Sequence, residues 1–445
     1  MLRRISLLLV LLLVAVACST GSDAPTTTDS TVPSETTTTA VEATTTTGGA
    51  SPTTSVPTNV TSTEPDLSYL EGLPDDVIAQ LEDLVRVAQD IRGLPFTEPP
   101  KITVVSEDEL EARVREDIEE ESEDLPADEA LYKMLGLLAD SADFENLVLD
   151  LYGEQVAGFY DGDTGEIVVP TRQDGFSLIQ QGTLVHELVH ALTDQHFSFN
   201  PRFQAMIDEE RLDEATAYQA LIEGDATLAE VLWVQTLSQR ELGEFIAASL
   251  DVDSASLEAA PRFLRESLLF PYDTGLGFVQ SLYVADSGWG GVNDAYTTLA
   301  ELPGSSEQVI TPDDYTRDLP VEVAIPDVDV AGYELERTSV WGEEGFRVML
   351  NQGSTEATMV TAADGWGGDS YHQWFDGENA AMLIVFAGDT PTDVDELEDA
   401  LLTFAQESFP EDHFAWVTQR DENLYFIAAD EPAVGEQIRS AVGLG

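Results

Sequence analysis

The chain has 445 residues, with 85 acidic against 19 basic side chains and a net charge of −66 at pH 7. Its length allows two or three domains with ample core, whereas its charge argues against nucleic acid or anionic lipid as a partner, because both would be repelled. The single cysteine, Cys18, leaves the folded part without disulfides, cysteine-ligated zinc or thiol catalysis.

Residues 1–17 have the features of a secretory signal peptide. Arginines at positions 3 and 4 precede an apolar run over residues 5–17, which is too short to span a bilayer as a helix. The run ends in the letters AVAC, which resemble the lipobox of bacterial lipoproteins, with Ala15 in place of the usual leucine. The resemblance implies lipidation of Cys18 and an extracytoplasmic protein anchored to the bacterial cell membrane. The alternative is a plain secretory signal that leaves a free thiol.

Residues 18–65 form a threonine-rich segment with scattered proline and serine and no aromatic residue. Such a composition cannot bury a core, so we expect a disordered stalk that tethers the folded protein to the lipid. The pattern of the folded part changes near Leu319, which predicts two domains, residues 66–318 and residues 319–445.

The first domain begins with mixed helices and strands. Hydrophobic spacing and turn residues predict helices over residues 74–92 and 107–121, a strand over 101–105, two helices within 127–151 and a β-hairpin over 156–169.

The helix expected over residues 183–197, TLVHELVHALTDQHF, contains an HExxH sequence. His186 and His190 are four residues apart, so a helix places both imidazoles on one face, where they could bind one metal ion. Glu187 would then reach a water on that metal, as in zinc proteases. Only 5 histidines occur in the chain, so a chance match is rare. A buried helix with two satisfied histidines is the alternative reading.

The rest of the chain divides into a helical stretch and an α+β stretch. A turn is expected at Asn200-Pro201, a long helix over residues 208–237 and mostly helix over 251–283. Beyond Leu319 the patterns predict helices over 341–350, 356–363, 394–408 and 433–442, and strands over 370–375, 380–386, 414–419 and 424–428. The expected fold class is therefore α+β, with a smaller α+β domain at the C-terminus.

The motif region resembles the zincin metallopeptidases. Glu223-Gly224-x-Ala226 further resembles the gluzincin branch, and HELVHALTDQHF, EGDA and FPYDTGLGF together resemble a group of predicted bacterial metallopeptidases, often lipoproteins. The likeness covers residues 66–315. It implies a small twisted sheet beside the motif helix, a helical subdomain, a Zn²⁺ ion held by His186, His190 and Glu223, and Glu187 as general base acting on a peptide or protein substrate. A strand just before such a helix commonly forms the sheet edge on which an extended substrate pairs.

The third ligand has two rivals to Glu223. His196 lies ten residues after His186, which is the spacing of metzincins, but Thr193 replaces their glycine and no Met-turn follows. Glu214 shares the stretch that carries Glu223 but lacks the neighbouring Gly224, which we expect to permit close packing against the motif helix.

Further roles are assigned to residues around the motif. Tyr272 is the candidate for stabilising an oxyanion, with Tyr160 and Tyr218 as rivals. Asp194, one turn beyond His190, could orient an imidazole or be a solvated helix-end acid. Asp225 should point away from the face of Glu223, since it lies only two residues further along the same helix.

The function expected is that of a membrane-tethered zinc peptidase. The alternatives are an aminopeptidase, a metzincin-type protease that uses His196, and a non-catalytic binding lipoprotein on a zincin scaffold. The intact Glu187 argues against the last, because a scaffold without activity has no need of the base. The oligomeric state is left open by the sequence.

We predict that the protein fractionates with membranes and carries a lipid on Cys18, because the apolar run and the stalk flank that residue. Cys18→Ala should release the protein or leave it unprocessed, as measured by membrane fractionation and mass spectrometry of the N-terminal peptide. Wholly soluble wild-type protein with an unmodified Cys18 would contradict the anchor.

Overall fold

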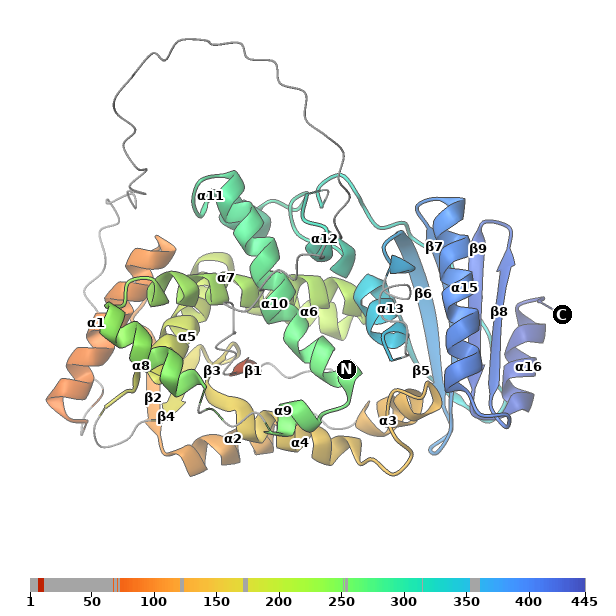
Figure 1. The fold of residues 1–445 in the computed structure, drawn as a ribbon, viewed down its shortest axis with the longest axis horizontal. Coiled ribbons are helices and arrows are strands. Elements are labelled where there is room, and N and C mark those ends of the chain that lie inside the picture. The colour runs from red at the N-terminus through yellow and green to blue at the C-terminus, as the bar shows by residue number, and fades with distance from the viewer. Residues whose placement is uncertain are drawn as a thin grey trace, which may run out of the picture.

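The computed structural model describes residues 7–11, 67, 70, 73–120, 124–170, 175–250, 252, 255–313, 315–352 and 361–444. It is an α+β fold in which a largely helical part with one sheet and a C-terminal part with a second sheet lie along the long axis (Figure 1). Cys18 and the predicted stalk lie outside the described residues, as does most of the expected helix over 356–363. No helix among the described residues is both long and apolar enough to span a membrane.

The first sheet has the order β1-β3-β4-β2, from β1 (Leu7–Leu11), β3 (Val156–Asp161), β4 (Glu166–Pro170) and β2 (Lys101–Val105). The expected hairpin is present as the antiparallel pair β3–β4, and β2 runs parallel to β4 on its other side. The strand just before the motif helix is therefore internal, and the expectation that it forms the edge is wrong. β3 has only β1, paired antiparallel, between it and the edge.

Most helices of the first part agree with the sequence patterns. They are α1 (Asp75–Arg92), α2 (Glu107–Glu120), α3 (Leu125–Met134), α4 (Phe144–Gln155), α5 (Leu178–Phe197), α6 (Phe199–Asp208), α7 (Leu212–Val234), α8 (Gln239–Ser249), α9 (Ala255–Ala259), α10 (Arg262–Ala285), α11 (Gly290–Thr297) and α12 (Ser306–Ile310). Where a turn was expected after the motif helix, the chain forms α6, because Pro201 falls in the first turn and its missing N–H has no helical partner to lose. α8 was not predicted, although the capping box of Ser238 and Glu241 marks its start.

The motif helix α5 is buried from Gly182 to Thr193. It starts five residues before the expected stretch, at a capping box in which the Gln180 N–H donates to Ser177 Oγ and the Ser177 N–H donates to Gln180 Oε1. It packs against α1, α7, α8 and β3. This position places the polar side chains of the motif, His186, Glu187 and His190, in the protein interior.

Helices α7 and α10 cross with almost no space between their backbones. A Cβ added to Gly224 of α7 would lie 2.2 Å from the carbonyl oxygen of Gly275, and one on Gly275 would lie 2.3 Å from that of Ala220. Gly224 therefore permits close packing against α10. The expectation that it serves the motif helix is wrong, because α5 packs on a different face of α7.

The second sheet has the order β5-β6-β7-β9-β8. Its strands are β5 (Glu334–Ser339), β6 (Trp366–Phe375), β7 (Ala380–Gly388), β9 (Asn423–Ala429) and β8 (Phe414–Arg420), and its helices are α13 (Gly342–Leu350), α15 (Pro391–Ser408) and α16 (Pro432–Ala441). α13 and α15 cover one face and α16 the other, so the sheet is buried on both sides (Figure 1). β5 was not predicted, and β6 begins four residues earlier than expected.

One hydrophobic core crosses the boundary predicted near Leu319. It joins Leu131 of α3 and Leu268 of α10 to Phe346 of α13 and Met382 of β7. The linker also follows the second sheet, with the Val321 N–H donating to the carbonyl of Gly367. The two parts therefore share buried surface.

We predict that Gly275→Ala lowers the free energy of unfolding by at least about 2 kcal/mol, because its methyl group would overlap a backbone carbonyl that cannot move independently. Gly277→Ala, two residues along the same helix, is the matched control, since an added Cβ there meets nothing within 4 Å. It should be neutral or stabilising by up to about 1 kcal/mol. Equal urea denaturation curves for the two variants would contradict the close crossing.

Candidate metal centre

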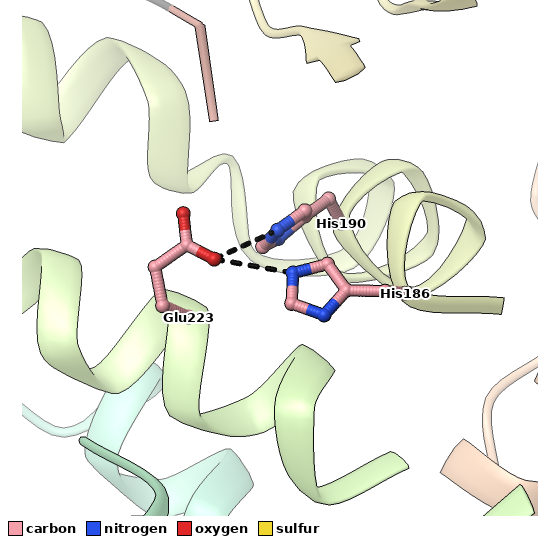
Figure 2. A group of neighbouring side chains, drawn as sticks. All are labelled: His186, His190 and Glu223. Carbon is pink, nitrogen blue, oxygen red and sulfur yellow. Dashed lines mark hydrogen bonds and ion pairs between the residues drawn. The ribbon is translucent and has the colours of Figure 1, made fainter. Parts of the chain in front are cut away.

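Three side chains from two helices converge in the interior of the first part (Figure 2). His186 and His190 project from α5, and Glu223 faces them from α7. Glu223 Oε2 lies 3.1 Å from His186 Nε2 and 3.3 Å from His190 Nε2. The two imidazole rings are 4.6 Å apart between centroids. Candidate ligand atoms of all three residues lie within 4.8 Å of one another, so the group could hold one metal ion.

The group is fully enclosed and holds polar atoms without partners. His190 is completely buried, and both its ring nitrogens lack a hydrogen bond within the described structure, as does Glu223 Oε1. Burial lowers the pKa of His190, which favours the neutral imidazole that binds metals. Although burial opposes it, Glu223 and Glu230 raise the pKa of His186 to about 10. These features fit a site that favours a cation between the rings and the carboxylate.

Glu223 itself is held as a carboxylate. Burial alone would raise its pKa, but the neighbouring imidazoles of His190 and His186, the latter through a hydrogen bond, lower it to about 2. An ionised carboxylate oxygen is the form that a metal ion binds.

Glu187 is buried beside the two histidines and has no exposed surface. Burial raises the pKa of its carboxyl well above the ordinary value, which His186 opposes and Glu223 reinforces. Both carboxylate oxygens lack a hydrogen-bond partner among the described residues. The carboxylate of Glu187 is therefore a stronger base than that of an exposed glutamate, and no hydrogen bond within the described residues occupies its oxygens.

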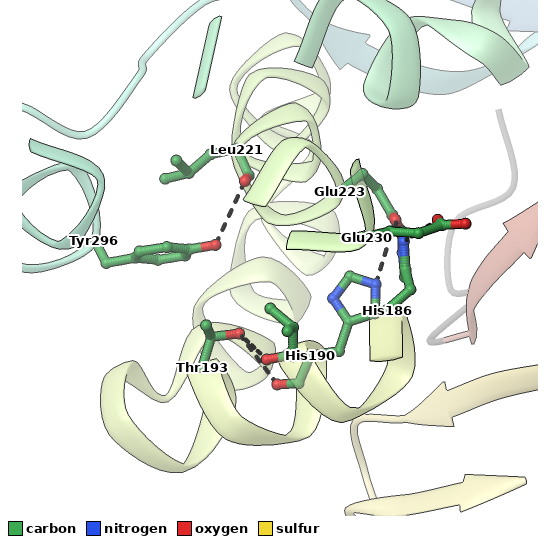
Figure 3. A network of polar contacts seen from close by, with 8 residues as sticks. His186, His190, Thr193, Leu221, Glu223, Glu230 and Tyr296 are labelled. Carbon is green, nitrogen blue, oxygen red and sulfur yellow. Dashed lines mark hydrogen bonds and ion pairs between the residues drawn. The ribbon is translucent and has the colours of Figure 1, made fainter. Parts of the chain in front are cut away.

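Glu230 is a site residue that the sequence reasoning missed. Its Oε2 lies 3.7 Å from His186 Nδ1, whereas Glu223 contacts Nε2 of the same ring (Figure 3). A carboxylate there can orient the imidazole and increase its basicity as a ligand. The available signal was the interval of seven residues, two helical turns, which puts Glu230 on the same face of α7 as Glu223.

The two rivals for the third ligand position lie elsewhere. His196 Nε2 is 2.7 Å from the carbonyl oxygen of Pro95, in the last turn of α5. Glu214 pairs with Arg211 at 2.5 Å, near the start of α7. Within the described residues, Glu223 is thus the candidate that joins the two histidines.

Of the three tyrosines considered, Tyr272 has its ring beside His186, 6.3 Å between centroids. The ring of Tyr160 stacks 6.5 Å from His190, but its hydroxyl donates to Asp194 Oδ2 at 2.8 Å. Tyr218 lies under the guanidinium of Arg202. Asp194 also accepts from a backbone N–H of α6, so its carboxylate fastens β3 and α6 to the motif helix.

Asp225 points away from Glu223, as expected, and pairs with an arginine buried with it. Its Oδ1 lies 2.8 Å from Arg92 Nε, and neither side chain is exposed. Arg92 also donates to Asn293 at 2.8 Å and stacks over Trp289 at 4.4 Å. These contacts of Arg92 link α1, α7 and α11 on the side of α7 that faces away from the group of His186, His190 and Glu223.

Tyr272 also lines a cavity of about 190 Å³. The cavity is lined by helices of the first part, by α13, and by Arg337 of β5 and Tyr371 of β6. Its walls are mainly apolar, with Phe144, Phe263, Leu264 and Met349 among them. Gln219 of α7, four residues before Glu223, lines it as well. The cavity could therefore hold an apolar side chain of a ligand near the group of His186, His190 and Glu223.

Comparison with known proteins adds little. Residues 331–439 match a family described as a domain of unknown function (DUF8575). No curated protein matches the chain, and no solved structure does. The matched segment covers all five strands of the second sheet, α13, α15 and most of α16, and it leaves out α5 and α7.

We predict that Glu223→Gln weakens binding of a divalent transition metal at least about a hundredfold, because loss of a direct ligand should cost more than loss of an outer-sphere partner, which costs up to about a hundredfold. Competition against a chromogenic chelator measures the affinity. Glu214→Gln, which removes a charge from the same helix, and His196→Ala should bind as the wild type does. Loss of the metal in His196→Ala with full binding in Glu223→Gln would assign the third position to His196.

Proposed function

We propose that the protein is a zinc-dependent peptidase of the zincin type that acts outside the cytoplasm. The observation that carries this proposal is that both imidazole Nε2 atoms approach one oxygen of Glu223, while the same helix presents Glu187 beside them. Two histidines and one carboxylate are a usual ligand set of catalytic zinc. A small sheet beside the motif helix, together with a glutamate from a following helix, supports the zincin assignment and its gluzincin branch.

In this proposal each residue around the site has a separate role in hydrolysis. A zinc ion supplies an acidified water and a Lewis acid for the scissile carbonyl. Glu187 takes a proton from the water and later delivers it to the leaving amine. Tyr272, beside His186, is the candidate donor to the developing oxyanion. Glu230 keeps the His186 ring in the orientation that binds metal.

The surroundings support an extended peptide with a large apolar side chain as the substrate. β1 of the chain itself pairs antiparallel along β3, and this supports the proposal that an extended substrate pairs there through main-chain hydrogen bonds. If residues 1–17 are removed as a signal peptide, the same edge becomes open to a substrate. The cavity bordered by Tyr272 would then take an apolar side chain next to the cleaved bond.

We predict that Glu187→Gln retains the bound metal while peptidase activity falls at least about a hundredfold, the usual scale for losing a general base. Digestion of a peptide library, with mass spectrometry of the products, measures the activity and shows whether large apolar residues flank the cut. Glu214→Gln is the control and should cleave as the wild type does. A Glu187→Gln variant that cleaves at the wild-type rate would contradict the mechanism.

A further inference from the structure

A second group of ligand atoms lies where the two parts of the chain meet. Glu307 comes from α12, Asp318 from the segment that leaves the first part, and Asp389 from the turn between β7 and α15. One carboxylate oxygen of each lies within 4.8 Å of the others. α12 also packs against α7 and α13, so the group bridges the junction (Figure 1).

Within the residues that the structure describes, none of these three carboxylates has a hydrogen-bond donor or a cation as partner. Glu307 is only 5 % exposed, yet among the described residues its side chain makes no hydrogen bond and no ion pair, and it points into the group. Its electrostatic neighbours include further acids, Asp213 and Glu343. The Oε2 atom of Glu343 is also buried without a hydrogen-bond partner, although its other oxygen pairs with Arg347.

Such an arrangement is unfavourable without a counter-charge. An ionised carboxylate that is buried without a compensating group is destabilised by the loss of its hydration, and like charges at this distance destabilise it further. The buried carboxylates of Asp213 and Asp369 accept hydrogen bonds from backbone N–H groups, and those of Asp225 and Asp128 have cations, Arg92 and Arg337 respectively. The three carboxylates at the junction have none within the described part of the chain.

The backbone around the group fixes two of the three positions. The Asp389 N–H donates to the carbonyl of Gly365 at 3.1 Å, and Gln308 Nε2 donates to the carbonyl of Asp318 at 2.5 Å. A Cβ on Gly367 would lie 3.0 Å from Asp389 Oδ1, so a glycine there leaves room for the carboxylate. Asp389 is exposed, which gives an ion access from solvent.

We propose that Glu307, Asp318 and Asp389 form a calcium site that joins the two parts of the protein. A set made only of oxygen ligands selects a hard cation, in contrast to the histidines of the first group. Ca²⁺ binds oxygens at about 2.3–2.6 Å, so ligands on opposite sides of the ion stand up to about 5 Å apart, whereas Mg²⁺ requires a tighter shell. Water completes the shell. The ion then balances the charge at the junction and fastens the C-terminal sheet to α12.

The test is titration of the purified protein with CaCl₂ at constant ionic strength, followed by calorimetry and by the melting temperature. The wild type should bind Ca²⁺ and melt at a higher temperature in its presence, because the ion binds only the folded state. Asp389→Asn and Glu307→Gln should each weaken the affinity at least about tenfold and remove the rise in melting temperature. Without calcium, Glu307→Gln should melt no lower than the wild type, since it relieves repulsion at the junction.

Asp90→Asn is the matched control, because Asp90 is an exposed acid on α1 at the other end of the molecule. It should respond to calcium as the wild type does. Absence of a response in the wild type, or an equal response in all four proteins, would overturn the proposal. An equal rise in melting temperature with MgCl₂ would overturn the assignment to calcium. The outcome is independent of peptidase activity, so it is separate from the test of Glu187.

Discussion

Burial of the Glu223 carboxylate between two imidazoles is the interaction on which the rest of the site depends. The carboxylates of Glu187 and Glu223 are buried beside two buried histidines, and that of Glu230, which is 17 % exposed, lies near His186. The free-energy cost of this concentration of negative charge is high unless a cation occupies the centre. The same enclosure strengthens every electrostatic interaction inside it, which is the condition under which a positioned base and a metal ion are effective.

Three consecutive residues of helix α7 contact three different helices. Consecutive residues of a helix point about 100° apart, so Glu223, Gly224 and Asp225 face three different partners. Glu223 reaches α5, Gly224 lies against α10 and Asp225 pairs with Arg92 of α1. The close crossing at Gly224 fixes the height and rotation of α7, and the buried ion pair anchors it from behind. A short polar segment therefore sets the position of one ligand through contacts that are not themselves part of the site.

The acidic composition has a consequence at the junction as well as at the surface. With 85 acids and 19 bases, most carboxylates cannot find a basic partner in the chain, and at the surface water solvates them. Where the second sheet meets the first part, however, Glu307 and Glu343 are buried. A core shared across the boundary near Leu319 holds these acids close together, so attachment of the C-terminal sheet is linked to how their charge is balanced.

The sequence by itself determined the local features of the site. The helical repeat fixes His186 and His190 on one face with Glu187 next to them, and no tertiary contact is needed for that inference. Strong periodicity likewise predicted α1, α5, α7 and the strands of the hairpin. α8 and β5 were missed because short elements with a mixed polar pattern carry a weak periodic signal. α6 was missed because a proline that ends a helix elsewhere is acceptable in its first turn.

The tertiary structure alone decided which distant residue meets the histidines. Glu223 lies 33 residues after His190, and such an interval fixes no distance, whereas His196 at a familiar spacing points to the carbonyl of Pro95. The choice between them rests on how α7 packs against α5, which depends in turn on its crossing with α10. Glu230 behind His186 and the acids at the junction come together for the same reason: contacts between separate elements depend on packing geometry, which local periodicity does not encode.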